Sequence, residues 1–255
     1  FNETHIHYLK IHATIGLVGW FLMLIIGVGS TLIPMFLISH QLNFNKLKAS
    51  FYLINTGLLG IAINWFLINN SILLGVCWML VAVGVLFFVS FIYDSYKKRM
   101  RKKLDVGMRY SMLAIASIHI PIVISSVLIF GFNVEFELLS RVVVFYGFSI
   151  LFGFITTLIL GQTYKTLPFI IWLEKYKKQV GKTKTPLPRE LYSEKIASIQ
   201  FYLYLGFIII IPIGILSNSL VLVKIGSIAL LLVTILYNIN VFKIILHKVK
   251  QIKND

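Results

Sequence analysis

Long apolar runs dominate the chain, and short segments rich in polar and basic residues separate them. The runs approach about 20 residues, the length that an α-helix needs to cross roughly 30 Å of hydrocarbon. Each spanning segment must satisfy its own backbone groups, and runs this long predict helices rather than barrel strands. We therefore expect seven membrane helices, at residues 11–38, 51–69, 72–93, 107–131, 139–173, 196–216 and 221–246.

Composition agrees with an all-α, polytopic membrane bundle. Hydrophobic residues make up 58% of the 255 positions, charged residues 13%, and the mean hydropathy is +0.88. Soluble domains average roughly 45–50% apolar and about 25% charged residues. The single cysteine, Cys77, excludes an internal disulfide and a CxxC redox pair.

The net charge of +15 has two interpretations, a nucleic-acid partner or basic cytoplasmic loops. Membrane proteins concentrate Lys and Arg in cytoplasmic segments, which favours the second interpretation and a lipid bilayer as the partner, with no nucleic acid. The alternation places the N-terminus outside and the C-terminus in the cytoplasm, and we expect a bacterial inner membrane. Basic loops at 94–110 and 174–195 are then cytoplasmic, and loops at 69–71, 132–138 and 217–220 face outside. Of the 24 Lys and Arg residues, four lie outside the basic segments: Lys10, Arg141, Lys165 and Lys224.

Two stretches predict an internal repeat at one ungapped offset of 134 residues. "GWFLMLIIGVGSTLIPMF" at 19–36 aligns with "GFITTLILGQTYKTLPFI" at 153–170, matching two glycines and one proline. Both stretches belong to spans that run inward, so the repeat is parallel, about an axis along the membrane normal. We expect a first unit of four helices at 1–131 and a second of three at 132–255, in one membrane domain, with Tyr146 at the position that matches His12.

These residues resemble the haem-copper oxidase subunit I superfamily. The likeness rests on His12 standing seven residues before Gly19-Trp20, on a helix that runs inward and carries a proline near its end. The likeness in sequence covers about 25 residues. Elsewhere only the helix arrangement is alike, since that superfamily is built from four-helix arcs with haem-ligand histidines near the outer face. The resemblance implies a haem b cofactor and a redox, electron-transport or gas-handling role with oxygen or nitric oxide.

The chain also departs from that family. Thr14 stands where the family helix has a second histidine, and we find neither paired histidines for a copper site nor the family's histidine–tyrosine pair at helical spacing. The resemblance therefore implies an incomplete metal set, with a further membrane subunit or additional N-terminal helices beside His12. Whether the protein is an enzyme stays open.

Histidines supply the candidate ligands. His12 shares a helical face with Gly16 and Gly19, whose missing side chains leave flat space for a macrocycle or, alternatively, for close packing of another helix. We expect His12 to be the haem and metal ligand of the N-terminal three, and His5 and His7 to be solvated. His119 is expected to be buried at mid-membrane, either functional or structurally bonded to Ser117 or a carbonyl freed by Pro121; its depth differs from that of His12 by about 20 Å.

Lys165 lies within the fifth span beside Thr163 and Tyr164. One interpretation is the inner mouth of a proton path, and the other is a long side chain reaching the cytoplasmic interface. No carboxylate lies inside a predicted span, which disfavours an ion-coupled transporter. A non-catalytic scaffold, sensing or assembly subunit on the same fold remains the principal alternative to a haem protein.

Overall fold

The computed structural model describes residues 3–131, 136–180 and 185–248, with side chains from Tyr8 on. Over these ranges the chain is all-helical, and its only extended pairing is an isolated bridge between Ser39 and Arg99. Seven helices are long and apolar enough to span a membrane, which confirms the predicted number and kind of elements. They are Tyr8–Leu37, Phe44–Ile68, Ser71–Lys97, Val106–Phe130, Phe136–Gln179, Glu194–Leu216 and Leu220–Ile245.

The chain divides into two compact units. Unit 1 comprises residues 1–103 and 125–132, and unit 2 comprises residues 104–124 and 133–255. Residues 104–124, which the repeat assigns to the first half of the sequence, thus belong to unit 2. Unit 1 contains α1 (Glu3–Thr14), η1 (Ile15–Leu22), α2 (Met23–Leu37), α3 (Phe44–Ile63), η2 (Asn64–Ile68) and α4 (Ser71–Lys97).

Unit 2 contains the remaining elements. The helix α6 (His119–Phe130) is divided between the units, because its residues from Ser125 on belong to unit 1. These elements are α5 (Val106–Ser117), α7 (Phe136–Phe148), η3 (Ser149–Thr156), α8 (Thr157–Tyr176), the short η4 (Lys177–Gln179) and η5 (Pro188–Leu191), α9 (Glu194–Leu216) and α10 (Leu220–Ile245).

Short polar side chains start most of the described spans. Each N-cap side chain accepts a hydrogen bond from a backbone N–H that has no partner inside the helix. Asn43 caps α3 in this way, and the helix begins at Phe44, seven residues before the predicted start at 51. The other capping residues are Asn70, Asp105, Ser193 and Ser219.

Two spans change helix type near their middle. The segments η1 and η3 are π-helices, in which each N–H bonds to the carbonyl five residues earlier. The turn is wider than an α-turn, so the positions that share one face change across it. Such segments are frequent at functional sites.

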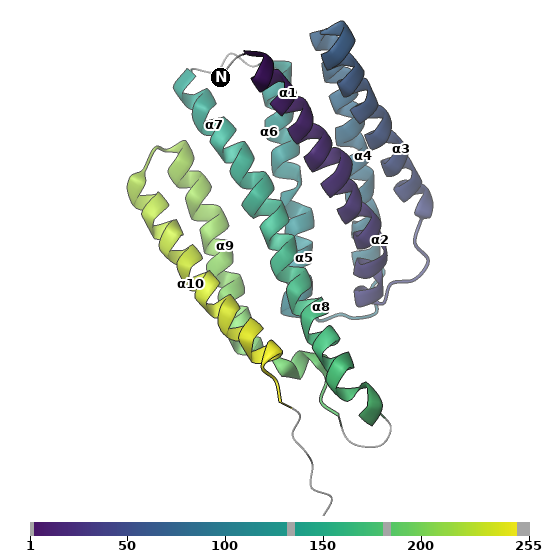
Figure 1. The fold of residues 1–255 in the computed structure, drawn as a ribbon, viewed down its shortest axis with the longest axis vertical. Coiled ribbons are helices and arrows are strands. Elements are labelled where there is room, and N and C mark those ends of the chain that lie inside the picture. Colours follow the sequence, from purple (N-terminus) through teal and green to yellow (C-terminus); the bar gives the residue numbers. More distant parts are fainter. Residues whose placement is uncertain (1–2, 132–135, 181–184, 249–255) are drawn as a thin grey trace, which may run out of the picture. The chain divides into compact units, whose positions relative to one another are not determined.

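Glycines allow the helices of unit 1 to pack closely. A Cβ on Gly57 of α3 would lie 2.7 Å from the carbonyl oxygen of Cys77 on α4, and one on Gly84 of α4 would lie 2.7 Å from Ile54. The two helices run side by side and are joined through Asn69, whose left-handed conformation (φ 52°) asparagine tolerates (Figure 1). Near the other end of the pair, Lys46 Nζ lies 2.5 Å from Asp94 Oδ2.

Unit 2 uses the same devices. Asn218 (φ 55°) joins α9 to α10, and a Cβ on Gly226 would lie 2.6 Å from the side chain of Ile211. Between α5 and α8, Gly107 and Gly161 bring the backbones together, since a Cβ on either would lie 2.8 Å from the carbonyl oxygen of the other.

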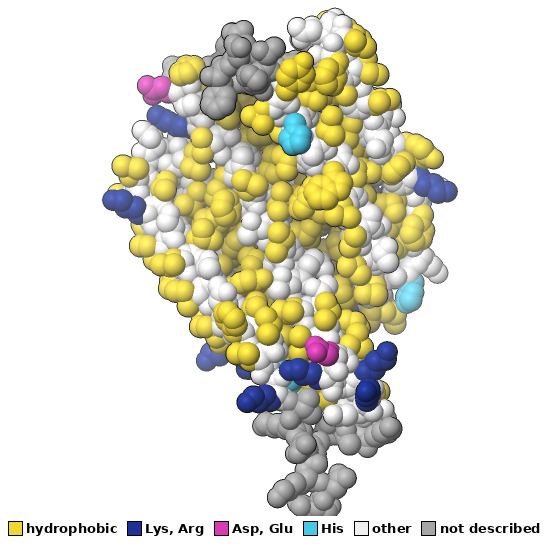
Figure 2. Space-filling view, viewed as in Figure 1, with side chains coloured by type: hydrophobic (Ala, Val, Ile, Leu, Met, Phe, Trp, Pro, Cys, Tyr) yellow, Lys and Arg dark blue, Asp and Glu magenta, His cyan; other side chains and the backbone are white. Residues whose placement is uncertain are grey.

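Large hydrophobic side chains remain exposed along the spans, among them Trp20, Leu67 and Ile72. Figure 2 shows hydrophobic side chains over much of the visible surface. A soluble monomer rarely exposes apolar surface on this scale, whereas hydrocarbon-facing helices require it.

Candidate functional site

His12 is an exposed side chain in the last turn of α1, at the junction with η1. Beside it, a Cβ on Gly16 would meet no atom within 4 Å, so this side of the helix has open space. Gly19 differs, because its Cβ would contact Leu58 of α3 at 3.4 Å. The wide π-turn separates their faces, and the structure therefore brings Gly16, but not Gly19, to the open surface at His12.

The backbones of His5 and His7 belong to α1, but their side chains fall outside the described part of the structure.

His119 begins α6, near the middle of the span Val106–Phe130, and its side chain is exposed on the helix surface rather than packed against other helices. Nδ1 lies 2.9 Å from the carbonyl oxygen of Ala116. Ser117 is not its partner, because Ser117 Oγ donates to the carbonyl oxygens of Ala114 and Gly153. Pro121 lacks an N–H, which removes one helical bond near the interruption between α5 and α6.

Among the residues with described positions, no three His, Cys, Asp or Glu side chains come together as a metal centre. A chelating protein cage is thus not formed by this part of the chain. A haem does not need such a cage, because a single imidazole can ligate its iron.

Lys165 forms a largely buried ion pair with Asp105. The Lys165 side chain is 9% exposed and that of Asp105 15%. Asp105 Oδ1 also accepts from Met108 N at 3.0 Å, so one carboxylate caps α5 and holds the ammonium group of α8. The ammonium group is therefore held by a protein carboxylate rather than extended along the helix surface.

Tyr164 belongs to a buried polar cluster, which we name the Gln200 cluster: Tyr110, Tyr164, Gln200 and Asn240. Tyr164 Oη donates to Gln200 Oε1 at 2.5 Å and accepts from Asn240 Nδ2 at 3.2 Å. Gln200 and Asn240 are fully buried. Thr163 lies outside the cluster, accepting from Tyr237 Oη at 3.2 Å and donating to the carbonyl of Ile159.

Two buried atoms of this cluster have no hydrogen-bond partner among the described residues, Tyr110 Oη and Gln200 Nε2. The Tyr110 ring packs edge-on against Phe201, with centroids 4.9 Å apart, and has no solvent exposure. Leaving such a group unpaired costs about 1–3 kcal/mol, and ordered internal water usually completes sites of this kind.

Sequence reasoning found Lys165 and Tyr164 but missed their partners. Asp105 was assigned to a loop, and Gln200 and Asn240 are single polar residues inside apolar runs. The available signal was the cost of burying an isolated amide, which marks such residues as bonded or functional.

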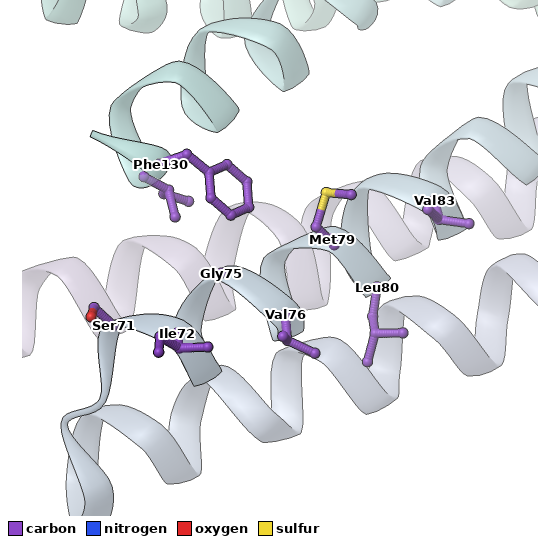
Figure 3. A pocket seen from close by; sticks show the side chains of 9 residues that line it. Ser71, Ile72, Gly75, Val76, Met79, Leu80, Val83 and Phe130 are labelled. Carbon is purple, nitrogen blue, oxygen red and sulfur yellow. The ribbon is translucent and has the colours of Figure 1, made fainter. Parts of the chain in front are cut away.

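Unit 1 has an apolar groove of about 670 Å³ at the start of α4. Figure 3 shows Met79 and Phe130 beside it, with Gly75 between the turns that line it. Phe130 packs so closely that a Cβ on Gly75 would lie 2.9 Å from its ring. Ser71 supplies the only polar side chain of the lining, so the groove offers no group for chemistry.

The apolar spans and their exposed hydrophobic surface define a polytopic helical membrane protein. No protein-family model, no curated protein and no solved structure matches the chain.

Proposed function

We propose that the chain is a haem-binding integral membrane protein similar in plan to haem-copper oxidase subunit I, with His12 as an axial ligand of haem b. The observation that carries this proposal is the exposed imidazole of His12 beside the open surface at Gly16, within an apolar span. A neutral imidazole nitrogen is a good ligand for haem iron. When bound, haem would supply one-electron chemistry or binding of oxygen or nitric oxide. A second ligand would come from another helix or a partner subunit, and not from His119.

Helix type supports the parallel repeat that this plan requires. The π-segments η1 and η3 begin at residues 15 and 149 and end at residues 22 and 156, the same offset of 134 as the sequence match. Pro34 and Pro168 are buried inside α2 and α8 at that offset.

Burial supports the repeat in the following helix of each half. The helices α3 and α9 begin at residues 44 and 194, an offset of 150. Four buried positions of α3 recur at that offset as buried positions of α9. The pairs are Ser50 with Gln200, Ile54 with Tyr204, Gly57 with Phe207, and Ile61 with Ile211. An experimental structure in which these helices are related by an axis in the membrane plane would contradict a parallel repeat.

The second repeat has the polar interior. At the matching positions the first repeat has Ser50 in place of Gln200 and Ser30 in place of Tyr164. We place a proton path in the second repeat, with Lys165, Thr163 and Tyr164 as its residues. The outward N-terminus, the cytoplasmic C-terminus and the bacterial inner membrane belong to the same proposal.

Visible absorption of purified protein tests the haem proposal. Protein expressed with added haem should show a haem b Soret band. His12→Ala should lose the band, and Gly16→Leu should weaken it because a leucine fills the open space while His12 remains. His40→Ala is the matched control, since His40 is also exposed but lies beyond α2, and it should keep the band. A band that survives His12→Ala, or a folded wild-type protein without colour, refutes the proposal.

One observation favours the alternative of a non-catalytic membrane subunit. His119 exposes a polar ring in the middle of an apolar span, and a polar group facing lipid is costly. A partner helix that covers it would remove that cost. A photo-crosslinker at Ile120, the exposed neighbour of His119, should then capture another membrane chain in cells, even when the purified protein is colourless.

A further inference from the structure

Unit 2 has a second, smaller cavity of about 240 Å³ where α9 turns into α10. The second turn of α7 forms one side of it, and the turn after α9 forms another. Its polar lining consists of Ser140, Arg141, Asn218 and Ser219, and its apolar lining includes Val144 and Val223. The cavity is therefore polar at one end and apolar at the other.

The polar end lies at the limit of the apolar spans. The described span that includes α9 ends at Leu216, and the next begins at Leu220. Lipid headgroups flank the hydrocarbon core at this level. Val144 and Val223 each lie about one turn further into the membrane than Arg141 and Leu220.

Arg141 has donors to spare. Its Nη1 reaches the carbonyl oxygen of Leu216 at 3.4 Å, and its Nη2 reaches Glu137 Oε2 at 3.4 Å. Both contacts are long, and a guanidinium group carries five N–H donors in a planar fork that suits phosphate. The first N–H groups of α10 add positive potential at the same cavity, because they have no acceptor inside the helix.

Glu137 decides which headgroup fits best. Its carboxylate is 85% exposed and lies one turn before Arg141 on α7. It repels a headgroup with excess negative charge and attracts an ammonium group. The pair thus complements a zwitterion, with phosphate toward Arg141 and ammonium toward Glu137.

We propose that this cavity binds the phosphate of an ethanolamine phospholipid, with Arg141 on the phosphate and Val144 and Val223 against the first part of the acyl chains. The site is separate from the proposed haem site, and its occupant holds α7 against the α9–α10 hairpin within unit 2. A free phosphate would satisfy Arg141 but leave the apolar wall without a partner, which is why the lipid is the occupant.

Native mass spectrometry of the delipidated full chain tests the proposal, with phosphatidylethanolamine, phosphatidylglycerol or inorganic phosphate added. Wild-type protein should retain phosphatidylethanolamine best. Arg141→Gln should lower that affinity roughly tenfold, as expected for loss of a charge-assisted bond. Lys224→Gln is the matched control, because Lys224 is exposed on α10 but does not line the cavity, and it should leave binding unchanged.

Two further variants keep the test decisive if Arg141→Gln folds poorly. Val144→Phe fills the cavity and keeps Arg141, so it should also lose the lipid. Glu137→Gln should keep binding but lose the preference for ethanolamine over glycerol headgroups. Equal lipid retention by wild type, Arg141→Gln and Val144→Phe would overturn the proposal, as would displacement of the lipid by millimolar phosphate.

Discussion

Lys165 is held by a carboxylate 60 residues earlier in the chain, and the pair shows how strongly one residue in a membrane span depends on another. Both side chains are largely buried, so each charge depends strongly on the opposite charge beside it. Removing one partner of a buried pair leaves an unpaired charge, whereas removing both leaves none.

We therefore predict that Lys165→Met lowers the free energy of unfolding by about 3–5 kcal/mol. The double variant Lys165→Met, Asp105→Asn should recover part of that loss. Asparagine keeps the cap on Met108 N, so the comparison isolates the charge. Thermal or denaturant unfolding in lipid nanodiscs measures each variant. Strictly additive effects of the two single changes would show that the groups are not coupled.

A second residue-scale prediction concerns His247, just beyond the end of α10. Tyr176 Oη lies 2.8 Å from His247 Nε2, and Lys175 donates to the His247 carbonyl. Burial, with Lys175 and Lys243 nearby, lowers the pKa of His247 below its ordinary value. The folded state therefore binds fewer protons at this site than the unfolded state. The stability that neutral His247 contributes is thus present above about pH 6.5 and is lost as pH falls below that value.

Hydrogen exchange of residues 243–248 should accordingly speed up between pH 7.5 and pH 5.5, after correction for intrinsic exchange. His247→Gln keeps an acceptor and a donor but does not titrate, so the pH effect should disappear in it. The same pH effect in both proteins would assign it to another group.

Pairs of helices are the next scale, and their contacts depend on small residues. Gly57 faces the α4 backbone at Cys77, where nothing can shift cheaply, whereas a Cβ on Gly27 of α2 would meet no atom within 4 Å. Overpacking a tight contact costs typically 1–3 kcal/mol, while Gly to Ala in an open helical position gains up to about 1 kcal/mol.

Gly57→Ala should therefore destabilise the protein by about 1–3 kcal/mol, and Gly27→Ala should be neutral or mildly stabilising. Unfolding followed by circular dichroism in the same nanodiscs compares the two. Equal effects would mean that helix propensity, rather than the α3–α4 contact, determines the outcome.

Hydropathy predicted all seven spans because burial in lipid is a property of each segment by itself. Their ends were less predictable. The α3 helix starts at Phe44 because the side chain of Asn43 caps it, a local bond that hydropathy does not register. The π-segments lie in sequences such as "IGLVGWFL" that an α-helix would also accept, so hydropathy does not register the change of helix type. The same limit applies to the candidate site, since hydropathy cannot pair Asp105 with Lys165.

The whole molecule is basic, and its orientation is the prediction that belongs to this scale. Cysteines introduced at Asn70 and Asn218 should react with an impermeant reagent from outside the cell, and one at Lys178 only after the cytoplasmic side is opened. Native Cys77 is buried and gives little background. Reaction of Lys178→Cys in intact cells would reverse the orientation inferred from the basic loops.

The connection between η2 and α4 leaves only Asn69 and Asn70 outside the helices. Closing so short a loop costs little entropy, and every contact between α3 and α4 lies within residues that precede Lys98. The buried amide of Asn64 is bonded inside the same turn, where its Oδ1 accepts from Asn70 N at 2.9 Å. During synthesis, α3 and α4 can thus enter the bilayer as a closed pair, and the indole N–H of Trp78 gains its partner, Ser126 Oγ, only when α6 arrives.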